Sequence, residues 1–211
     1  MSRKYKILSI TLKKEKKKKR YIVTLSNNNA FEVSEDVLID KSLYINKEIY
    51  KTDLDKILLR ESFSNVREAA LVLLNYRMRS KKELALRLHR KGFTTIQIES
   101  TIVELEEKGL IDDEKFGLFF ARDNVKRSLL GPVALKHRLK SHFLSFEIIE
   151  KICDNIYQEF PIESLIRDII NKHSLNDLKN HSKNKKRLIS KLKRKGYCWN
   201  DIEPVLKYYN I

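Results

Sequence analysis

The chain has few of the residues that interrupt or cross-link a fold. Five Gly and three Pro in 211 residues predict a mostly helical protein with short connections. The two Cys are too few for a disulfide framework, and neither they nor the five His have metal-ligand spacing. No apolar run reaches the length of a membrane span, and no signal-peptide core follows Met1. We therefore expect a cytoplasmic protein with no metal, no cofactor and no membrane contact.

Motifs of catalysis are also missing. The sequence contains no phosphate-binding loop, dinucleotide fingerprint, nucleophile–base pair or paired acid and base, so we predict that it is not an enzyme. What is abundant is positive charge: 44 Lys and Arg against 28 Asp and Glu give a net charge of +16. Such an excess indicates a polyanionic partner. The apolar share of 42% is sufficient for a folded core.

One helical pattern occurs three times, with offsets of 51 and 53 residues. Its positions are the sets Leu84, Leu88, Phe93, Ile98, Glu99, Ile102; Leu135, Leu139, Leu144, Ile149, Glu150, Cys153; and Leu188, Leu192, Tyr197, Ile202, Glu203, Leu206. A fixed period predicts a supersecondary unit that buries its apolar face against neighbouring copies. We expect the leucines and Cys153 to be core residues, and such an array to suit an extended partner.

The first 60 residues differ from the rest. Alternating apolar positions around Ile10, Val23 and Val33 predict a three-stranded antiparallel meander, with hairpins near 16–18 and near Asn28. Short helices are expected at 35–38 and 52–61.

The remaining chain is predicted to be helical. The expected helices are 66–78, 80–91, 94–108, 112–128, 161–172, 184–195 and 199–209, with a polar loop at 176–184. Two further helices are expected to open at Gly131-Pro132 and at Ser145. Asp112 and Ser145 are expected N-caps, and Gly92, Gly109 and Gly196 are expected helix stops. We predict a mainly α fold of tandem three-helix repeats in an elongated array, with a small N-terminal antiparallel β module. The boundaries are 1–61 for the β module and 62–110, 111–160 and 161–211 for the repeats.

A specific resemblance supports this division. The motif residues are Arg77, Arg79, Ser80, Glu83, Leu84, Lys91, Gly92, Phe93, Gly109, Leu110, Ile111, Asp112, Asp113, Phe116, Gly131 and Pro132. This pattern resembles the RecX family, regulators of the RecA recombinase in homologous recombination, DNA repair and the SOS response. Two positions depart from the family pattern: Phe143 stands where Gly is usual, and Cys198 replaces a Thr, Ser or Asp cap. The first departure predicts a distorted helix end and the second a weak helix start.

The resemblance implies binding along the groove of RecA–DNA filaments and negative modulation of RecA. The sequence does not determine the oligomeric state, and a monomer is the default expectation. Arg87, Arg138 and Lys191 share one repeat position and are expected to form a basic stripe that contacts the phosphates of single- and double-stranded DNA. The full set of candidate contacts is Arg77, Arg79, Lys81, Lys82, Arg87, Arg90, Lys91, Lys136, Arg138, Lys140, Lys186, Arg187, Lys191 and Arg194. Phe116, Phe119 and Phe120 are expected in the core, with base stacking as the alternative.

A second function remains open. Helical trios with a basic second helix also suit a sequence-nonspecific nucleic-acid-binding protein that acts without RecA. The helices lack a clear Asn, Gln and Arg set for reading base edges, so base-specific recognition is not predicted. Binding to filaments, compared with binding to naked DNA, separates the two functions.

Overall fold

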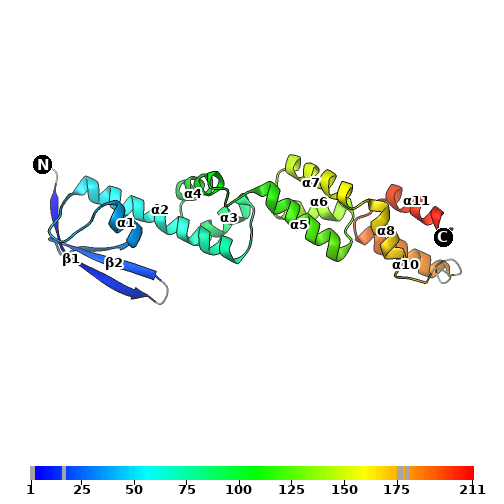
Figure 1. Ribbon diagram of the computed structural model, residues 1–211, viewed down its shortest axis with the longest axis horizontal. Helices are drawn as coiled ribbons and strands as arrows, with labels where there is room; N and C mark the ends of the chain where they lie inside the picture. Colours follow the sequence, from blue (N-terminus) through cyan, green and yellow to red (C-terminus); the bar gives the residue numbers. More distant parts are fainter. Residues whose placement is uncertain (1–2, 16–17, 175–177, 179–180) are drawn as a thin grey trace. The chain divides into compact units, whose positions relative to one another are not determined.

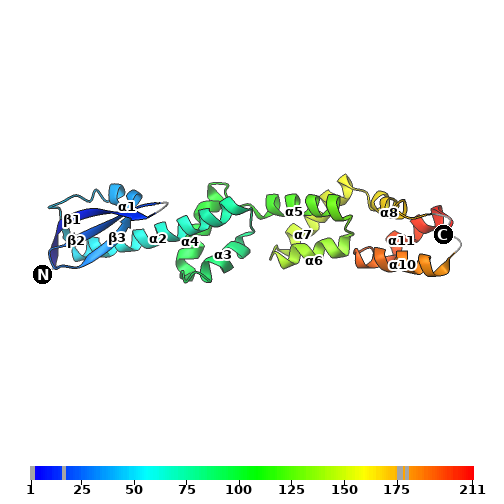
Figure 2. The same cartoon turned by 90° about the horizontal axis from the view of Figure 1, so that it is seen from below.

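A computed structural model describes residues 3–15, 18–174, 178 and 181–211. The chain forms two compact units, of which the first contains residues 1–76 and 87–104 and the second contains residues 77–86 and 105–211. Figures 1 and 2 show a strand-rich N-terminal part followed by helices. The fold is therefore mainly α with a small antiparallel sheet, as the sequence predicts.

The sheet of the first unit has four strands. β1 (Lys4–Glu15), β2 (Lys18–Leu25), β3 (Ala30–Ser34) and β4 (Glu48–Tyr50) are arranged in the order β3-β2-β1-β4. The Asn28 turn is confirmed, with left-handed φ 62° at Asn28 and its N–H donating to the Leu25 carbonyl at 2.9 Å. β1 and β2 pair as far as Glu15 and Lys18, but residues 16 and 17 of the other predicted hairpin lie outside the described residues. Strand β4 was not predicted, because three residues are too short to show alternation.

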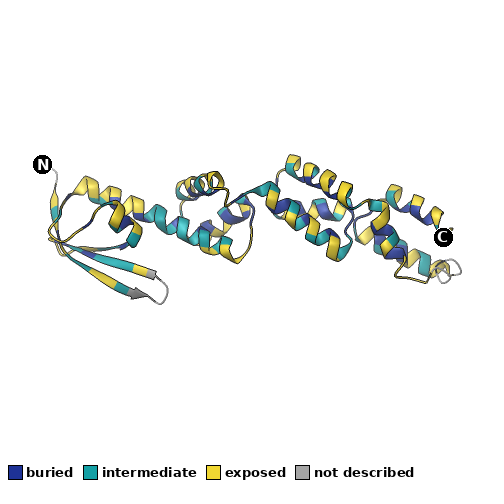
Figure 3. Ribbon diagram, in the orientation of Figure 1, coloured by how far each residue is buried: buried dark blue, intermediate teal, exposed yellow. Residues whose placement is uncertain are grey.

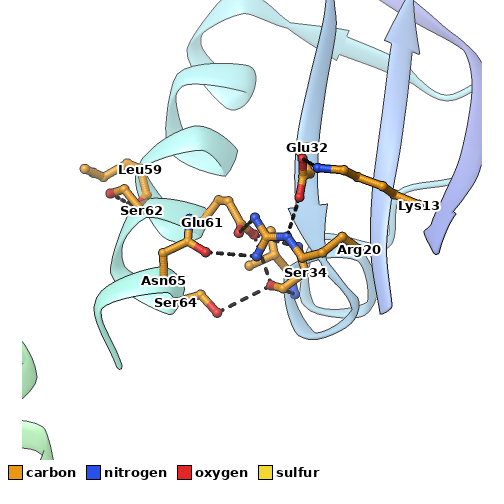
Figure 4. A network of polar contacts seen from close by, with 10 residues as sticks. Lys13, Arg20, Glu32, Ser34, Leu59, Glu61, Ser62, Ser64 and Asn65 are labelled. Atoms are coloured by element: carbon orange, nitrogen blue, oxygen red, sulfur yellow. Dashed lines mark hydrogen bonds and ion pairs between the residues drawn. The ribbon is translucent and has the colours of Figure 1, made fainter. Parts of the chain in front are cut away.

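The helix α1 (Glu35–Asp40) confirms the short helix expected after the sheet. The break expected near residue 62 is wrong, because α2 (Lys51–Tyr76) is one helix of 26 residues. Figure 4 shows the polar contacts between the sheet and the middle of this helix. Arg20 on β2 forms an ion pair with Glu61 at 2.9 Å, and the Ser34 N–H donates to the same carboxylate at 2.8 Å. The boundary predicted at 61/62 therefore falls inside a helix that the sheet contacts at its middle.

The first unit has its own core, which lies between the sheet and the helices. Its buried members are Ile7, Val23, Leu25, Val33, Val37, Leu43, Ile49 and Ile57. Further along α2, Arg67 forms an ion pair with Glu104 at 3.2 Å. Glu104 lies on α4 (Thr95–Glu107), which follows α3 (Lys81–His89) and the left-handed Gly92 at φ 90°. Both helices and the glycine stop between them confirm the prediction.

The second unit contains α5 (Asp113–Ser128), α6 (Pro132–Ser141), α7 (Phe146–Glu159), α8 (Ile162–Ile170), α10 (Ser182–Arg194) and α11 (Trp199–Tyr208). Asp112 and Ser145 are N-caps, as predicted, and they accept from the N–H groups of Lys115 and Ile148. Residues 176, 177, 179 and 180 of the loop expected at 176–184 lie outside the described residues. The predicted end of that loop is wrong, because α10 begins earlier than expected, at Ser182. Figure 3 shows the buried stripes of these helices facing one another.

The repeat leucines are confirmed as core. Leu84, Leu135 and Leu188 are buried at one repeat position, and Leu88, Leu139 and Leu192 are buried at the next. Cys153 is also buried, and burial raises the pKa of its thiol to about 11. Because the thiolate is the reactive form, Cys153 is a packing residue.

A close backbone joint links α6 to the turn between α10 and α11. The Gly131 N–H donates to the Lys195 carbonyl at 2.8 Å, and the Val133 N–H donates to the Gly196 carbonyl at 3.1 Å. The first amides of a helix have no partner within the helix, so these carbonyls satisfy them. A Cβ on Gly131 would lie 2.6 Å from the Gly196 carbonyl carbon, which explains why glycine occupies this position.

An equivalent contact, here called the repeat joint, occurs one repeat earlier and is formed by different chemical groups. Ser80, at the repeat position of Gly131, donates through Oγ to the His142 carbonyl at 2.6 Å, and His142 is the counterpart of Lys195. The Lys81 N–H donates to the Asp113 carboxylate at 2.7 Å. A side chain therefore replaces a backbone contact at the equivalent position.

The helix α11 begins after Cys198, as predicted. The Cys198 N–H donates to the Asp201 carboxylate at 2.9 Å, which is the acid's half of a capping box. The weak start stays a prediction.

Replacing Phe143 by glycine is expected to raise the free energy of unfolding by about 1 kcal/mol. Phe143 has φ 63°, a conformation in which a Cβ is crowded and glycine is not. Denaturant unfolding checks this. The matched control is Gly92→Ala, at the same repeat position with φ 90° and no described heavy atom within 4 Å of the new Cβ. This variant should lower the free energy of unfolding by a similar amount. Unchanged midpoints in both variants would contradict the argument.

Candidate nucleic-acid interface

The most basic element of the second unit is α10. Its residues Ser182–Arg194 include no carboxylate, whereas Leu188 and Leu192 are buried. The two leucines fix which side of the helix faces the core, so the Lys and Arg side chains line the remaining sides.

One side of α10 borders a hollow of about 540 Å³, here named the His173 hollow. Its polar lining residues are His173, Ser174, Asn184, Arg187, Lys191 and Arg194. Lys191 Nζ lies 3.2 Å from His173 Nε2. No carboxylate is among the lining residues that the structure describes, so the hollow has the chemistry of an anion site.

A second hollow of about 520 Å³ adjoins the first, here named the Ser190 hollow. It is lined by Lys183, Lys186, Arg187, Ser190 and Arg194. Arg187 and Arg194 border both hollows. The two hollows therefore form one continuous basic surface along α10.

The basic surface extends toward α6. Burial first, and then the charges of Lys191, Lys172 and Arg138, hold the pKa of Lys195 below its usual value. Arg138 and Lys191 are thus close enough to Lys195 to repel its charge. Each of these two residues of one repeat position therefore acts on Lys195; their contact with DNA stays a prediction.

Two other candidates carry an acid partner. Lys81 Nζ lies 2.9 Å from Glu106, and Lys136 Nζ lies 2.6 Å from Glu150. In each case the hydrogen bond to the carboxylate is the first cause that raises the pKa of the lysine. Their charge is partly neutralised, so they offer less to a phosphate than the cations of α10.

The remaining candidates are exposed on both units. Lys82, Lys140 and Lys186 lie in the second unit, and Lys82 Nζ is 6.0 Å from the centre of the Phe143 ring. Arg87, Arg90 and Lys91 are exposed residues of the first unit.

The aromatic residues of α5 do not share one environment. Phe116 is buried, as expected, but Phe119 is 67% exposed, so its assignment to the core is wrong. Phe120 is half-buried and contacts His142 edge-on at 4.5 Å between ring centres. An apolar residue type alone does not decide which side of a helix is covered.

Metal-site and membrane-span features do not occur in the described part of the chain. In those residues no group of three His, Cys, Asp or Glu side chains has the arrangement of a metal site. Over the same ranges, no helix combines the length and the apolar character of a membrane span.

Comparison with known proteins decides the family. Residues 67–105 match the model of the first three-helix domain of RecX. The regulatory protein RecX of Lactobacillus johnsonii is 31% identical over 144 residues, which are 68% of this chain and 52% of that protein. The regulatory protein RecX of Listeria monocytogenes is 24% identical over 192 residues, 91% of this chain and 71% of that protein. This chain belongs to the RecX family. It spans about half the length of the Lactobacillus relative.

Solved structures of RecX proteins have the same fold. A crystal structure of regulatory protein RecX has a TM-score of 0.73 and 22% identity, over 96% of this chain and 99% of that chain. RecX from Lactobacillus salivarius has a TM-score of 0.61 and 20% identity, over 72% of this chain and 98% of that chain. At these identities the comparison supports the fold alone.

In this RecX-family chain, two of the predicted DNA contacts form part of the repeat joint. Arg77 Nη2 and Arg79 Nη1 both lie 2.5 Å from Glu83 Oε1. Burial raises the pKa of Glu83, but the hydrogen bond from Arg79 and the charge of Arg77 outweigh it and hold the pKa below its usual value. The Arg79 residue is 5% exposed, so its prediction as a surface contact is wrong; Arg79 stabilises the protein from within.

Sequence reasoning missed His173 and Asn184. Asn184 precedes Arg187 and Lys191 by three and seven residues, so helical spacing places it on the same face. The prediction of a loop up to residue 184 concealed that signal. For His173 the sequence offers no signal, because this residue precedes α10 and no helical spacing relates it to the cations of that helix.

Proposed function

We propose that this chain regulates the RecA recombinase by binding along RecA–DNA filaments and that it acts negatively. The observation that carries the proposal is the basic surface of α10, where two adjoining hollows are lined by Lys and Arg without a carboxylate among the described lining residues. The regulatory names of the RecX relatives support the same role.

The proposed mechanism is multivalent binding. Cations on α6 and α10 contact phosphates, which supplies salt-dependent affinity and a fast encounter. Other surfaces of the repeats contact RecA, which supplies specificity for the filament. Two weak contacts on one ligand give an affinity beyond either alone. Bound in this way, the protein hinders strand exchange and filament extension because it occupies the filament surface. It catalyses no reaction in this mechanism.

A second candidate is a RecA-independent, sequence-nonspecific nucleic-acid-binding protein. The same basic surface supports it, because phosphate contacts require no recombinase. The two functions differ in what is bound more tightly, the filament or the naked strand.

Binding of the protein to RecA–DNA filaments is expected to be at least about tenfold tighter than binding to the same naked DNA, because the filament adds protein contacts to the phosphate contacts. The measurement is a titration of labelled protein with filaments, naked DNA and free RecA at one salt concentration. Equal affinity for filament and naked DNA would contradict the proposal and favour the second candidate.

A further inference from the structure

The only tryptophan of the chain is held in place on the surface beside α10. Trp199 is the first residue of α11 and is 45% exposed. Lys193 Nζ lies 5.9 Å from the centre of its ring. The lysine therefore places a positive charge beside a half-exposed aromatic ring, a combination that suits a nucleobase and its phosphate.

The acid one helical turn after the ring is paired within α11. Glu203 lies four residues after Trp199, and Lys207 Nζ lies 2.9 Å from its carboxylate. The hydrogen bond from Lys207 is the main cause that lowers the pKa of Glu203. The negative charge one turn after the ring is therefore partly neutralised.

Lys193 connects Trp199 to the Ser190 hollow. Lys186, Ser190 and Lys193 are separated by four and three residues, so they share one face of α10. Lys186 and Ser190 line the Ser190 hollow with Lys183, Arg187 and Arg194. A cationic track on one face of α10 therefore reaches, through Lys193, the aromatic ring at the start of α11.

The previous repeat carries the same pair of residue types. Phe146, the first residue of α7, precedes Trp199 by 53 residues and is 71% exposed. Lys140 precedes Lys193 by the same 53 residues. An exposed aromatic ring at the start of the third helix is thus repeated with its lysine in two consecutive repeats. The first repeat has Thr95 and His89 there and lacks the pair.

We propose that Trp199 and Phe146 are stacking sites for the bases of single-stranded nucleic acid, with the cations of α10 binding the intervening phosphates. Single-strand binding proteins combine a basic track with rings on which any base can stack. This inference rests on the nucleic-acid contact in the proposed function and adds base stacking to its phosphate contacts.

The test uses naked oligomers, so its failure leaves the filament experiment unaffected. Oligothymidylate and an abasic oligomer of equal length present the same phosphates, but only the first has bases to stack. Wild-type protein should bind oligothymidylate about tenfold more tightly, and oligothymidylate alone should quench the emission of Trp199. The Trp199→Ala variant should lose most of this preference, and Phe146→Ala should lose part of it.

Two controls separate stacking from charge and from misfolding. Phe119→Ala removes an exposed ring of α5 (67% exposed) and should keep the preference. Arg187→Glu should weaken both oligomers equally, because both contain phosphates. Equal binding of the two oligomers by wild-type protein, with unquenched emission, would overturn the inference. Loss of filament binding by Trp199→Ala with both oligomer affinities unchanged would assign the ring to a protein contact and would also overturn it.

Discussion

Replacement of Arg138, Arg187 and Lys191 by glutamate is expected to weaken filament binding by about 100-fold or more, because charged hydrogen bonds to phosphate contribute about 1.5–3 kcal/mol each. The three residues lie on the α6 and α10 surface, where Arg138 and Lys191 both act on Lys195 and Arg187 borders both hollows. Affinity for naked DNA should become less salt-dependent, by up to about 0.9 in log–log slope for each phosphate that the variant no longer neutralises.

A matched charge control keeps this result specific. Lys115, Arg127 and Lys151 are 73%, 78% and 60% exposed, and each lies beside a carboxylate of its own. Their triple glutamate variant has the same net charge as the first and should keep most of the filament binding. Titrations over a range of salt concentrations, with circular dichroism for helical content, provide the measurement. Equal losses in the two variants would mean that net charge, not the α10 surface, governs binding.

Arg79→Ala is expected to lower the free energy of unfolding by about 3–5 kcal/mol, because it leaves the buried Glu83 carboxylate without its inner partner. Arg77→Ala is the matched control, since Arg77 lies at the same 2.5 Å from Glu83 Oε1 but its side chain is 40% exposed, against 5% for Arg79. An exposed ion pair contributes little, so Arg77→Ala should cost less than about 1 kcal/mol. Urea unfolding of both variants at pH 7 measures the two effects.

The pH dependence gives a second readout for Arg79. The pKa of Glu83 is lowered from 4.5 in the folded protein, so its ion pair stabilises the fold above that value and is lost as the pH falls through the folded-state pKa. Removal of Arg79 reduces this stabilisation. The difference between wild type and Arg79→Ala should therefore shrink when unfolding is repeated below about pH 4. A difference that does not change with pH would assign the effect of Arg79 to packing instead.

Local patterns determined most of the helical part of this protein. The leucine spacing predicts the buried faces of α3, α6 and α10, and Asp112 and Ser145 begin α5 and α7 as their capping chemistry indicates. These features depend on contacts a few residues apart, which a sequence displays directly. Family membership was also readable from the motif between Arg77 and Pro132. The division into three repeats and the contact with RecA stay predictions.

Some features depended on partners distant in the chain. The ion pair that joins the sheet to the middle of α2 is one example, because Arg20 is 41 residues before Glu61. The charge of Arg79 suggests a surface cation. The residue nevertheless occupies the repeat position of Leu130, and both side chains are buried. The fold accommodates the buried charge of Arg79 through its ion pair with Glu83. Likewise, only the fold unites His173 with Asn184 in one hollow. Sequence periodicity determines which face of a helix is buried, whereas tertiary packing decides which polar side chains are enclosed with a partner and which stay open to a ligand.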